Sequence, residues 1–592
     1  MSDPTTPPTT TRRALLRTLR LAPVLRKGLV VTLLLVVVGT AMQLVVPIVV
    51  QQIFDREILA AGGVDVGGVV RSGILGVIGI LVAAVAGRTA QLRLARASAH
   101  GLSDLRVLTF RHLHRLSMLH VQSERRGALV SRVTSDVGTI QDFLDFGGMM
   151  MLVGSAQVTL AVVVMLVYQW QLALVVVAGV VVYAVLLAWF QRILARAHDR
   201  VRERVADSLS ALSEAITGLP AVRAYGAEAP TLRRLRAALD AQFRAEFRTG
   251  RLGAVLFSSA ELFAGLITAT VIGIGVWLGV TSGVSAGTLL AFLFLVNLLV
   301  GPVQMLVETL DQAQTAGAGV RRILGVLDTP VDVADPPDGV DLPDGGLSVE
   351  ARGLRFRYPG TSVDVLEDVD VAIPAGTRVA IVGETGSGKT TFAKLVTRLL
   401  DPTAGTMAIG GVPVDRVRFA SLRSRVAYVP QEGFLFDTTI AGNVRYGRPD
   451  ATDEQVAAAF DDLGLAPWVE GLPSGLATPV GERGGQLSAG ERQLVALVRA
   501  WIADPDLLVL DEATSAVDPA LEVSLRTAIE RLTEGRTSLT VAHRLSTAEA
   551  SDEVLVFDRG RLVERGRHGE LVGAGGVYAD LFADWAAGTA AV

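Results

Sequence analysis

The segment Gly383–Thr391, which reads GETGSGKTT, determines the fold of the C-terminal part of this 592-residue chain. Residues 377–382 are mostly apolar and predict a buried strand, whereas residues 392–400 predict a helix. A glycine-rich turn between a strand and a helix directs backbone N–H groups toward phosphate. Lys389 adds positive charge there, and the hydroxyl of Thr390 is a candidate Mg²⁺ ligand. The segment therefore predicts a nucleoside triphosphate site on an α/β fold.

Five further motifs accompany this loop in a fixed order. The apolar strand 507–510 is followed by two acids, Asp511 and Glu512. The segment Leu487–Glu491 (LSAGE) opens a helical stretch from Arg492 to Ile502, so a helix N-terminus is available for phosphate. The remaining motif residues are Gln431 after Tyr428-Val-Pro, Asp518 at the end of SAVD, and His543 after LTVA. The set is far more specific than the glycine-rich loop alone.

These motifs resemble those of the ATP-binding cassette (ABC) transporters, and in particular an exporter-type (type IV) half-transporter with fused membrane and ATP-binding domains. The resemblance implies that Asp511 holds the Mg²⁺ shell, that Glu512 polarises the attacking water, and that His543 contacts the γ-phosphate. It also implies that Gln431 links Mg²⁺ and the water to the membrane domain. Asp518 falls in the segment that the family calls the D-loop.

The same resemblance groups the site residues by role, with ATP and Mg²⁺ as the expected cofactors. Tyr358 stands where the family places an aromatic residue that stacks on adenine. The candidate ATP-binding residues are Tyr358, Gly383, Glu384, Thr385, Gly386, Ser387, Gly388, Lys389, Thr390 and Thr391. The candidate catalytic residues are Lys389, Gln431, Glu512 and His543, and the candidate Mg²⁺ ligands are Thr390, Gln431 and Asp511. The signature, which acts on ATP bound to a partner subunit, consists of Ser488, Ala489, Gly490 and Glu491.

The composition indicates a membrane protein. Hydrophobic residues make up 50% of the chain and its mean hydropathy is +0.45, which is too apolar for an ordinary soluble protein. Stretches with little or no charge occur at 28–54, 66–87, 147–191, 252–281 and 287–307. Because 147–191 is long enough for two spans that meet at Tyr168–Gln171, we expect six spans. The lack of cysteine excludes disulfides and thiolate metal sites.

The charges between the spans predict their orientation. Basic residues precede the first span and fill the connections 88–132 and 192–251, whereas the third-to-fourth and fifth-to-sixth connections carry no charge. The positive-inside rule then places both termini and the ATP-binding domain in the cytoplasm of an inner (plasma) membrane. We interpret the first span as an anchored helix rather than a cleaved signal peptide. The dominance of arginine among the basic residues favours a bacterial source.

The predicted fold class is an α-helical membrane domain of six long transmembrane helices followed by an α/β P-loop NTPase domain of the ABC type. We expect a cytoplasmic tail (1–26), the six-span domain (27–327), a linker rich in Pro, Asp and Gly (328–346) and the ATP-binding domain (347–592). Both long connections are helical in pattern and too long for ordinary loops. By resemblance they contain coupling segments at 127–137 and 216–226, and 478–484 is the segment that touches coupling helices.

The resemblance implies ATP-driven export of an amphipathic small molecule, lipid or peptide by alternating access. Two alternatives are an exporter-fold importer of a siderophore or fatty acid, and an ATP-gated channel or regulator. Intact Glu512 and His543 argue against the channel, and the lack of any segment resembling a siderophore-reductase domain weakens the importer. The expected partners are membrane lipid, a small amphipathic substrate and a second half-transporter, with no nucleic acid.

Polar residues inside the spans are candidate cargo contacts. In the sixth span a set spaced by 7, 4 and 3 residues shares one helix face, and it consists of Asn297, Gln304, Glu308 and Asp311. Glu261 is the charged residue of the fifth span. Polar groups in a membrane usually face a bundle interior or a wet cavity. We expect these residues to line the translocation cavity and the acids to favour cationic or zwitterionic cargo. The alternatives are helix–helix hydrogen bonding and, for the last two, a cytoplasmic helix extension.

The signature predicts an asymmetric dimer. It departs from the family's usual Leu-Ser-Gly-Gly-Gln at Ala489, where a methyl group crowds the helix N-terminus, and at Glu491, which adds negative charge near the anion. The chain's own loop, Asp511, Glu512 and His543 are intact. This combination favours a heterodimer with a related half-transporter over a homodimer in which the altered signature is a neutral variation.

Overall fold

The computed structural model describes residues 28–59, 64–123, 126–511, 519–542 and 545–590. By their contacts these residues divide into two compact units, each of which is described by itself. The first unit contains the described residues of Met1–Leu113 and Gly127–Asp328, and the second contains those of His114–Arg126 and Thr329–Val592.

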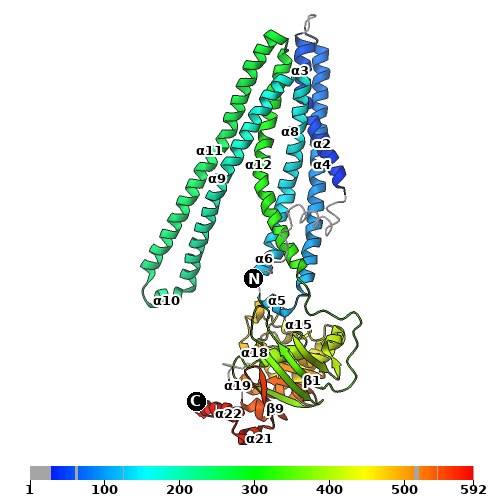
Figure 1. Ribbon diagram of the computed structural model, residues 1–592, viewed down its shortest axis with the longest axis vertical. Coiled ribbons are helices and arrows are strands. Elements are labelled where there is room, and N and C mark those ends of the chain that lie inside the picture. Colours follow the sequence, from blue (N-terminus) through cyan, green and yellow to red (C-terminus); the bar gives the residue numbers. More distant parts are fainter. Residues whose placement is uncertain (1–27, 60–63, 124–125, 512–518, 543–544, 591–592) are drawn as a thin grey trace. The chain divides into compact units, whose positions relative to one another are not determined.

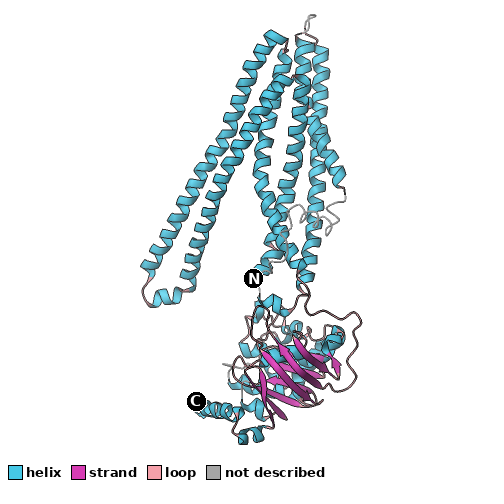
Figure 2. Cartoon of the chain, in the orientation of Figure 1, coloured by secondary structure: helices cyan, strands magenta, loops and turns pink. Residues whose placement is uncertain are grey.

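The first unit is built from long helices, and no strand occurs among its described residues (Figures 1 and 2). Its elements are α2 (Leu29–Gln43), α3 (Val45–Gln52), the π-helical turn η2 (Ile53–Ile58), α4 (Val66–Leu113), α6 (Arg126–Val133), α7 (Ser135–Asp142), the π-helical turn η3 (Phe143–Gly148), α8 (Met149–Tyr168), α9 (Trp170–Thr217), α10 (Leu219–Ala224), α11 (Glu228–Ser282) and α12 (Ala286–Asp328). The helix α11 runs beside α9, and the short α10 joins them at one end (Figure 1).

Six helical segments are long and apolar enough to cross a membrane, which confirms the predicted number. The third and fourth meet between Tyr168 and Trp170, at the polar turn that the sequence indicated. The segments Trp170–Thr217 and Glu228–Ser282 have 48 and 55 residues. At 1.5 Å per residue each is about 70 Å long or more, which is more than twice the roughly 30 Å thickness of a bilayer's hydrocarbon core. These helices must therefore continue well beyond the membrane.

A proline in α12 is compensated by a side chain from α8. Pro302 lies inside α12 and has no N–H to donate to the carbonyl of Leu298, four residues earlier. The buried Gln157 of α8 donates its Nε2–H to that carbonyl at 3.1 Å. Beside it, a Cβ on Gly154 would lie 3.3 Å from the side chain of Leu306, so the two helices approach closely at this glycine. The hydrogen bond satisfies a carbonyl that would otherwise be unpaired at membrane depth.

An ion pair joins α7 to the end of α12. Arg322 donates from Nε to both carboxylate oxygens of Asp136 at 3.1 and 3.0 Å, and from Nη2 to Oδ1 at 2.6 Å. The Asp136 side chain is only 10% exposed, whereas that of Arg322 is 52% exposed. Val137 and Ile140 of α7 and Val320 of α12 belong to one buried apolar cluster that joins the same two helices. A bidentate arginine–carboxylate pair fixes orientation as well as distance.

The second unit contains two sheets and a set of covering helices (Figure 2). The strands are β1 (Val349–Phe356), β2 (Leu366–Ile373), β3 (Arg378–Val382), β4 (Ala404–Ile409), β5 (Val412–Pro413), β6 (Val426–Val429), β7 (Leu507–Asp511), β8 (Thr537–Val541), β9 (Glu553–Asp558) and β10 (Arg561–Gly566). The helices are α5 (Met118–Ser123), α13 (Lys389–Val396), α14 (Phe419–Arg425), α15 (Ile440–Val444), α16 (Asp453–Asp462), α17 (Ala466–Glu470), α18 (Ala489–Ile502), α19 (Pro519–Thr533), α20 (Leu545–Glu549), α21 (His568–Ala574) and α22 (Val577–Ala590), with the 3₁₀ turns η4 (Val414–Arg416), η5 (Gly475–Ala477) and η6 (Glu482–Gly484).

The strand order brings the sequence motifs to one edge. The larger sheet has the order β10-β9-β3-β8-β7-β6, and its strands β9, β3, β8, β7 and β6 are parallel. The smaller sheet is antiparallel, with the order β2-β1-β4-β5. The glycine-rich loop follows β3, and Asp511 ends β7. Ligands of such sheets bind beyond the carboxyl ends of parallel strands, so the order positions a site there.

The segment His114–Arg126, which lies between two predicted spans, belongs to the second unit by its contacts. Leu119 of α5 packs against the same apolar core that contains β1, β2 and β3, and the Ser117 hydroxyl donates to Asp332 Oδ2 at 3.3 Å. A short helix from the connection between the second and third spans is therefore part of the packing of the α/β unit.

Candidate nucleotide-binding site

Two glycines allow the loop between β3 and α13 to fold as it does. Gly383 has a φ of +145°, and a Cβ at that position would lie 2.1 Å from the carbonyl oxygen of Phe557. Gly388, the residue before α13, has a φ of +101°, and its Cβ would lie 2.6 Å from the side chain of Leu366. Both the left-handed conformation and the close approach exclude other residues. No side chain caps α13, so the first N–H groups of α13 remain available for an anion.

Lys389 is held over the loop. It is 5% exposed, and its Nζ donates to the carbonyl oxygens of Gly383 and Glu384, each at 2.7 Å. Burial lowers the pKa of Lys389 from its ordinary value, and the nearby Asp511 carboxylate opposes that shift. The ammonium group is thus desolvated, and its hydrogen-bond partners among the described residues are carbonyl oxygens, so a phosphate oxygen would be a stronger partner than those it has.

Asp511 at the end of β7 is bound by hydroxyl groups on both oxygens. Thr390 Oγ1 donates to Oδ1 at 3.1 Å, and the Tyr428 hydroxyl donates to Oδ2 at 3.0 Å. Asp511 is 5% exposed. Burial, then the Asp511 charge, raises the pKa of Tyr428, so the phenol stays protonated as a donor. A carboxylate beside a threonine hydroxyl is an oxygen donor set of the kind that suits Mg²⁺, and the residues present fit that ion.

Tyr428 was missed by the sequence analysis, which used it only as the landmark before Gln431. The signal was the strand pairing: β6 lies beside β7, with Tyr428 paired to Val509, two residues from Asp511. A long phenol in a strand of small and apolar residues reaches the end of the neighbouring strand. Only the knowledge that β6 and β7 are adjacent turns that pattern into a contact.

Two more of the predicted ATP-binding residues are described, and one of them has an unused polar group. Ser387 is 3% exposed, and its hydroxyl oxygen has no hydrogen-bond partner in the described part of the chain. Tyr358, half-buried, forms a hydrogen bond of 3.1 Å between its hydroxyl and Thr391 Oγ1, and its ring packs edge-on against Phe356. The structure therefore places this predicted adenine-stacking residue beside the start of α13.

The signature residues form a helix N-terminus, as expected, but α18 begins at Ala489, three residues before the predicted start. Ser488 caps the helix: its hydroxyl accepts from the Glu491 N–H at 3.3 Å, and Glu491 Oε2 accepts from the Ser488 N–H at 2.7 Å. Glu491 Oε1 also accepts from Trp468 Nε1 at 3.2 Å. The carboxylate expected to face an anion is therefore turned back onto α18 and α17. Gly490 is buried beneath it.

These contacts set the charge state of Glu491. Burial by itself would raise the pKa of this carboxyl, but the hydrogen bonds from Ser488 and Trp468 outweigh it and the pKa lies below its ordinary value. Glu491 is therefore ionised at neutral pH. Its charge stays at the helix N-terminus, where it competes with any external anion for the same dipole.

Of the predicted residues that the structure describes, Gln431 is not joined to this cluster. Gln431 is exposed two residues beyond β6 and makes no hydrogen bond with any described residue. Glu512, Asp518 and His543 lie outside the described residues. Their assigned roles and that of Gln431 therefore stay predictions.

Among the described candidate cargo residues of the first unit, one pair is joined by a side-chain hydrogen bond. Gln304 Nε2 donates to Glu308 Oε1 at 3.0 Å, one turn apart on α12. Asn297 donates to the carbonyl of Leu293 on its own helix at 2.9 Å. Glu261 is an exposed residue of α11. The structure does not describe the side chain of Asp311. Among the described residues, no hydrogen bond links Glu261 to Asn297, Gln304 or Glu308.

Comparison with known proteins gives two family matches and close overall similarity. Residues 29–303 match the ABC transporter transmembrane region, and residues 366–515 match the ABC transporter family. The ATP-dependent lipid A-core flippase of Pseudomonas aeruginosa is 34% identical, over 83% of this chain and 81% of its own length. The uncharacterized ABC transporter ATP-binding protein YknV of Bacillus subtilis is 30% identical, over 93% and 90%. A solved bacterial Atm1-family ABC exporter with ATP bound superimposes with a TM-score of 0.78 at 27% identity, over 95% of this chain and 98% of that chain.

Proposed function

The chain belongs to the ABC transporter family as an exporter-type half-transporter, and from this premise we propose that it moves an amphipathic small molecule, lipid or peptide out of the cytoplasm by alternating access. ATP hydrolysis drives the movement. The observation that carries the proposal is the presence on one polypeptide of six membrane-length helices and a phosphate loop with Asp511 bound to Thr390.

The residues around the loop would bind the nucleotide in defined ways. The N–H groups at the start of α13 and the ammonium of Lys389 would hold the β- and γ-phosphates, for which Lys389 exchanges its two carbonyl partners. Thr390 and Asp511 would hold Mg²⁺, which when bound neutralises charge on the phosphates. Tyr428 keeps the Asp511 carboxylate oriented through its 3.0 Å hydrogen bond. We assign Glu512 to the attacking water, and His543 to the γ-phosphate.

The proposed working unit is a dimer. The N-terminus of α18 would meet the ATP of the partner subunit, with Ser488 and Gly490 at the contact. ATP binding would close the two ATP-binding domains, and hydrolysis would separate them again. This is a two-state equilibrium that a ligand biases. The coupling segments in the two long connections would pass the change to the membrane helices.

We place the protein in an inner (plasma) membrane with both termini and the ATP-binding domain in the cytoplasm. The support is the asymmetry of basic residues between the connections of the six segments. In this orientation the connections that contain α10 and α5 are cytoplasmic.

The cargo is proposed to be lipid-like. Several relatives, such as that of Pseudomonas aeruginosa, are lipid A-core flippases, and at 34% identity cargo class can be shared while the molecule differs. Each of the six segments contains an apolar stretch of membrane length with at most two charged residues. An amphipathic molecule that enters from the bilayer suits such walls better than a hydrophilic solute.

Inverted membrane vesicles test the proposal. With the ATP-binding domains outside, ATP should drive uptake of a labelled lipid-like cargo, and a Glu512→Gln variant should not support uptake. ATP-driven loss of preloaded cargo would indicate import instead. ATP hydrolysis without movement in either direction would support a regulator.

A further inference from the structure

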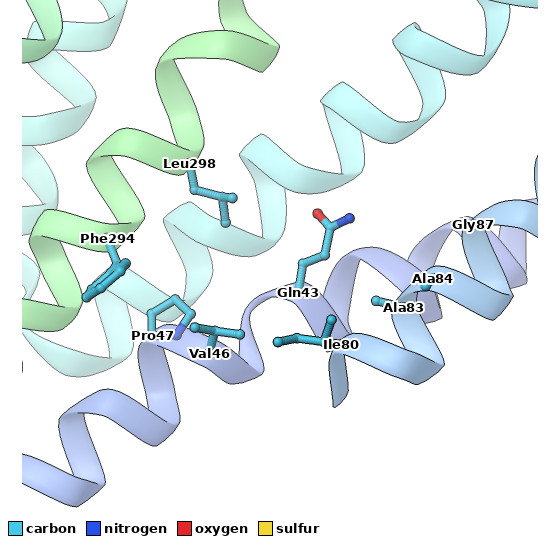
Figure 3. A pocket seen from close by; sticks show the side chains of 9 residues that line it. All are labelled: Gln43, Val46, Pro47, Ile80, Ala83, Ala84, Gly87, Phe294 and Leu298. Atoms are coloured by element: carbon cyan, nitrogen blue, oxygen red, sulfur yellow. The ribbon is translucent and has the colours of Figure 1, made fainter. Parts of the chain in front are cut away.

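The first unit contains a cavity of about 540 Å³ between α2, α3, α4 and α12 (Figure 3). Gln43 and Pro47 form one side, Ala83 and Gly87 of α4 form a second, and Phe294 and Leu298 of α12 form a third. The cavity is in the part of the unit that consists of candidate membrane spans.

The cavity arises from a break in the first span. The helix α2 ends at Gln43 and α3 begins at Val45, and between them the N–H of Leu44 bonds to the carbonyl of Ala41, three residues back, at 3.1 Å. Pro47 has no N–H to give to the carbonyl of Gln43.

The facing surface of α4 consists of small residues. Ala83, Ala84 and Gly87 line the cavity, so α4 leaves space where larger side chains would fill it. Just beside the cavity the helices are in contact, because a Cβ on Gly79 would lie 3.2 Å from Val45. The cavity is therefore a local gap in an otherwise close helix contact, and not a general separation of the helices.

The amide of Gln43 is the only polar side chain among the lining residues, and none of these residues is charged. Figure 3 shows it extending from α2 into the space toward Leu298. It has no hydrogen-bond partner among the described residues. Gln43 is 14 residues into a span of 30, at about half its length. Gln43 is an exposed residue of the single chain, so its amide is accessible to a ligand that enters the cavity.

We propose that this cavity binds the hydrocarbon chain of an amphipathic cargo and that Gln43 hydrogen-bonds an uncharged polar group, such as a hydroxyl, ester or amide, close to that chain. The inference rests on the proposed export function. An amide both donates and accepts, which matches these groups. A wall without charge offers nothing to a cationic head, because Glu261 and Glu308 do not line it. This site therefore selects neutral polarity, in contrast to the cationic preference expected from those acids.

The test is photolabelling of the full chain in lipid nanodiscs. One probe is a monoacylglycerol with a diazirine in its acyl chain, and the other has the same chain with a trimethylammonium head. The glycerol probe should label residues around 43–47, 80–87 and 294–298. Gln43→Leu should lower its labelling about five-fold, as expected for one lost hydrogen bond, and leave the cationic probe unchanged. Ala83→Trp should fill the cavity and prevent labelling by both probes.

Val85→Trp is the matched control, because Val85 is on the same helix, is 66% exposed and does not line the cavity. Its labelling should equal that of the unchanged chain. Equal labelling in Ala83→Trp, or labelling spread over other helices, overturns the cavity assignment. If the glycerol probe labels Gln43→Leu as strongly as the unchanged chain, the role of the amide is overturned. This second variant keeps the proposal testable if Ala83→Trp does not fold.

A separate readout keeps the two proposals apart. ATP-driven uptake by vesicles of the unchanged chain reports only the export function, whereas the positions labelled report only the cavity. Transport with labelling elsewhere removes the cavity and keeps the exporter. Labelling in the cavity without any transport leaves a lipid-binding site and removes the cargo interpretation.

Discussion

At the scale of single residues, Lys389 and Asp511 show how the loop is prepared for an anion and a cation together. Lys389 is buried with a lowered pKa, and within the described chain it is hydrogen-bonded only to two backbone carbonyls. Asp511, also buried, is bound only by hydroxyl groups in the described chain. Neither residue neutralises the other through a direct ion pair. Both can therefore turn to new partners without the loss of a strong one.

Replacement of Lys389 by alanine should abolish tight nucleotide binding. The variant loses the charge next to the phosphates, and we expect the dissociation constant for ATP to rise by at least tenfold, since charge-assisted hydrogen bonds contribute about 1.5–3 kcal/mol. Equilibrium binding of a fluorescent ATP analogue measures it. Lys394→Ala removes the same charge from the last turn of the same helix and should bind normally. Unchanged binding by Lys389→Ala would contradict the assignment.

Replacement of Tyr428 by phenylalanine should affect Mg²⁺ more than the nucleotide. Without its 3.0 Å hydrogen bond Asp511 Oδ2 is free to rotate, and we expect the Mg²⁺ concentration for half-maximal ATPase to rise about five-fold, from one hydrogen bond of about 1 kcal/mol. A Mg²⁺ titration at fixed ATP measures it. Tyr446→Phe is the control, because that hydroxyl makes no hydrogen bond with the described residues. An equal shift in both variants, or a change in binding of Mg²⁺-free ATP, would argue against the positioning role.

The contacts of Glu491 change the interpretation of its charge. The sequence indicates only a charge near an anion, whereas the structure shows that charge as part of a capping box with a tryptophan partner. Glu491→Gln keeps one acceptor oxygen, which can retain the bond from the Ser488 N–H but not also the bond from Trp468 Nε1, so it should lower the free energy of unfolding by less than Glu491→Ala does. Glu491→Ala orphans the Trp468 N–H and the Ser488 N–H and should cost about 1–2 kcal/mol. Thermal unfolding of the purified chain separates the two, and equal melting temperatures would exclude the contact as a stabilising one.

At the scale of elements, the number of spans could be predicted because bilayer thickness requires long apolar runs that few other structures contain. The break between α2 and α3 could not, because the residues around Leu44 are apolar except for Gln43 and a single proline at position 47 is compatible with the start of a helix as well as with a kink. The phosphate loop and signature were predictable from local motifs. The contacts of Tyr428 and Trp468 were not, because they depend on which strands and helices are neighbours.

The packing of α8 on α12 allows a double-mutant test. Gln157→Leu leaves the carbonyl of Leu298 without a donor, since Pro302 cannot supply one, and should destabilise the chain by about 1–3 kcal/mol. Pro302→Ala restores the N–H within α12. The double variant should therefore recover most of the loss, which is a coupling between the two sites. Melting temperatures of the four proteins in detergent measure it. Additive effects without recovery would show that Gln157 acts in another way.

At the scale of the whole molecule, the second unit carries one complete phosphate loop and one signature helix, and within the described residues no hydrogen bond joins Ser488 or Glu491 to that loop. A signature helix that does not contact the phosphate loop of its own chain requires the loop of a second chain. Which second chain is required depends on how well this signature binds an anion. Ala489 adds a methyl group at the helix start, and the ionised Glu491 occupies part of the helix dipole.

We therefore expect the chain expressed alone to hydrolyse ATP poorly and to gain activity with a related half-transporter. In a homodimer both ATP sites would use the altered signature, whereas in a heterodimer this chain's intact loop would face an unaltered one. Light scattering of the purified chain measures its oligomeric state, and steady-state assays measure its ATPase activity. Glu512→Gln is the control, which should lower any true activity by roughly 10²–10⁴-fold.

Glu491→Gln provides a second check, because it keeps the cap and removes the charge, so it should raise the activity of a homodimer. Robust hydrolysis by a stable dimer of this chain, abolished by Glu512→Gln and insensitive to Glu491→Gln, would show that the signature is fully competent and that a homodimer is the working form.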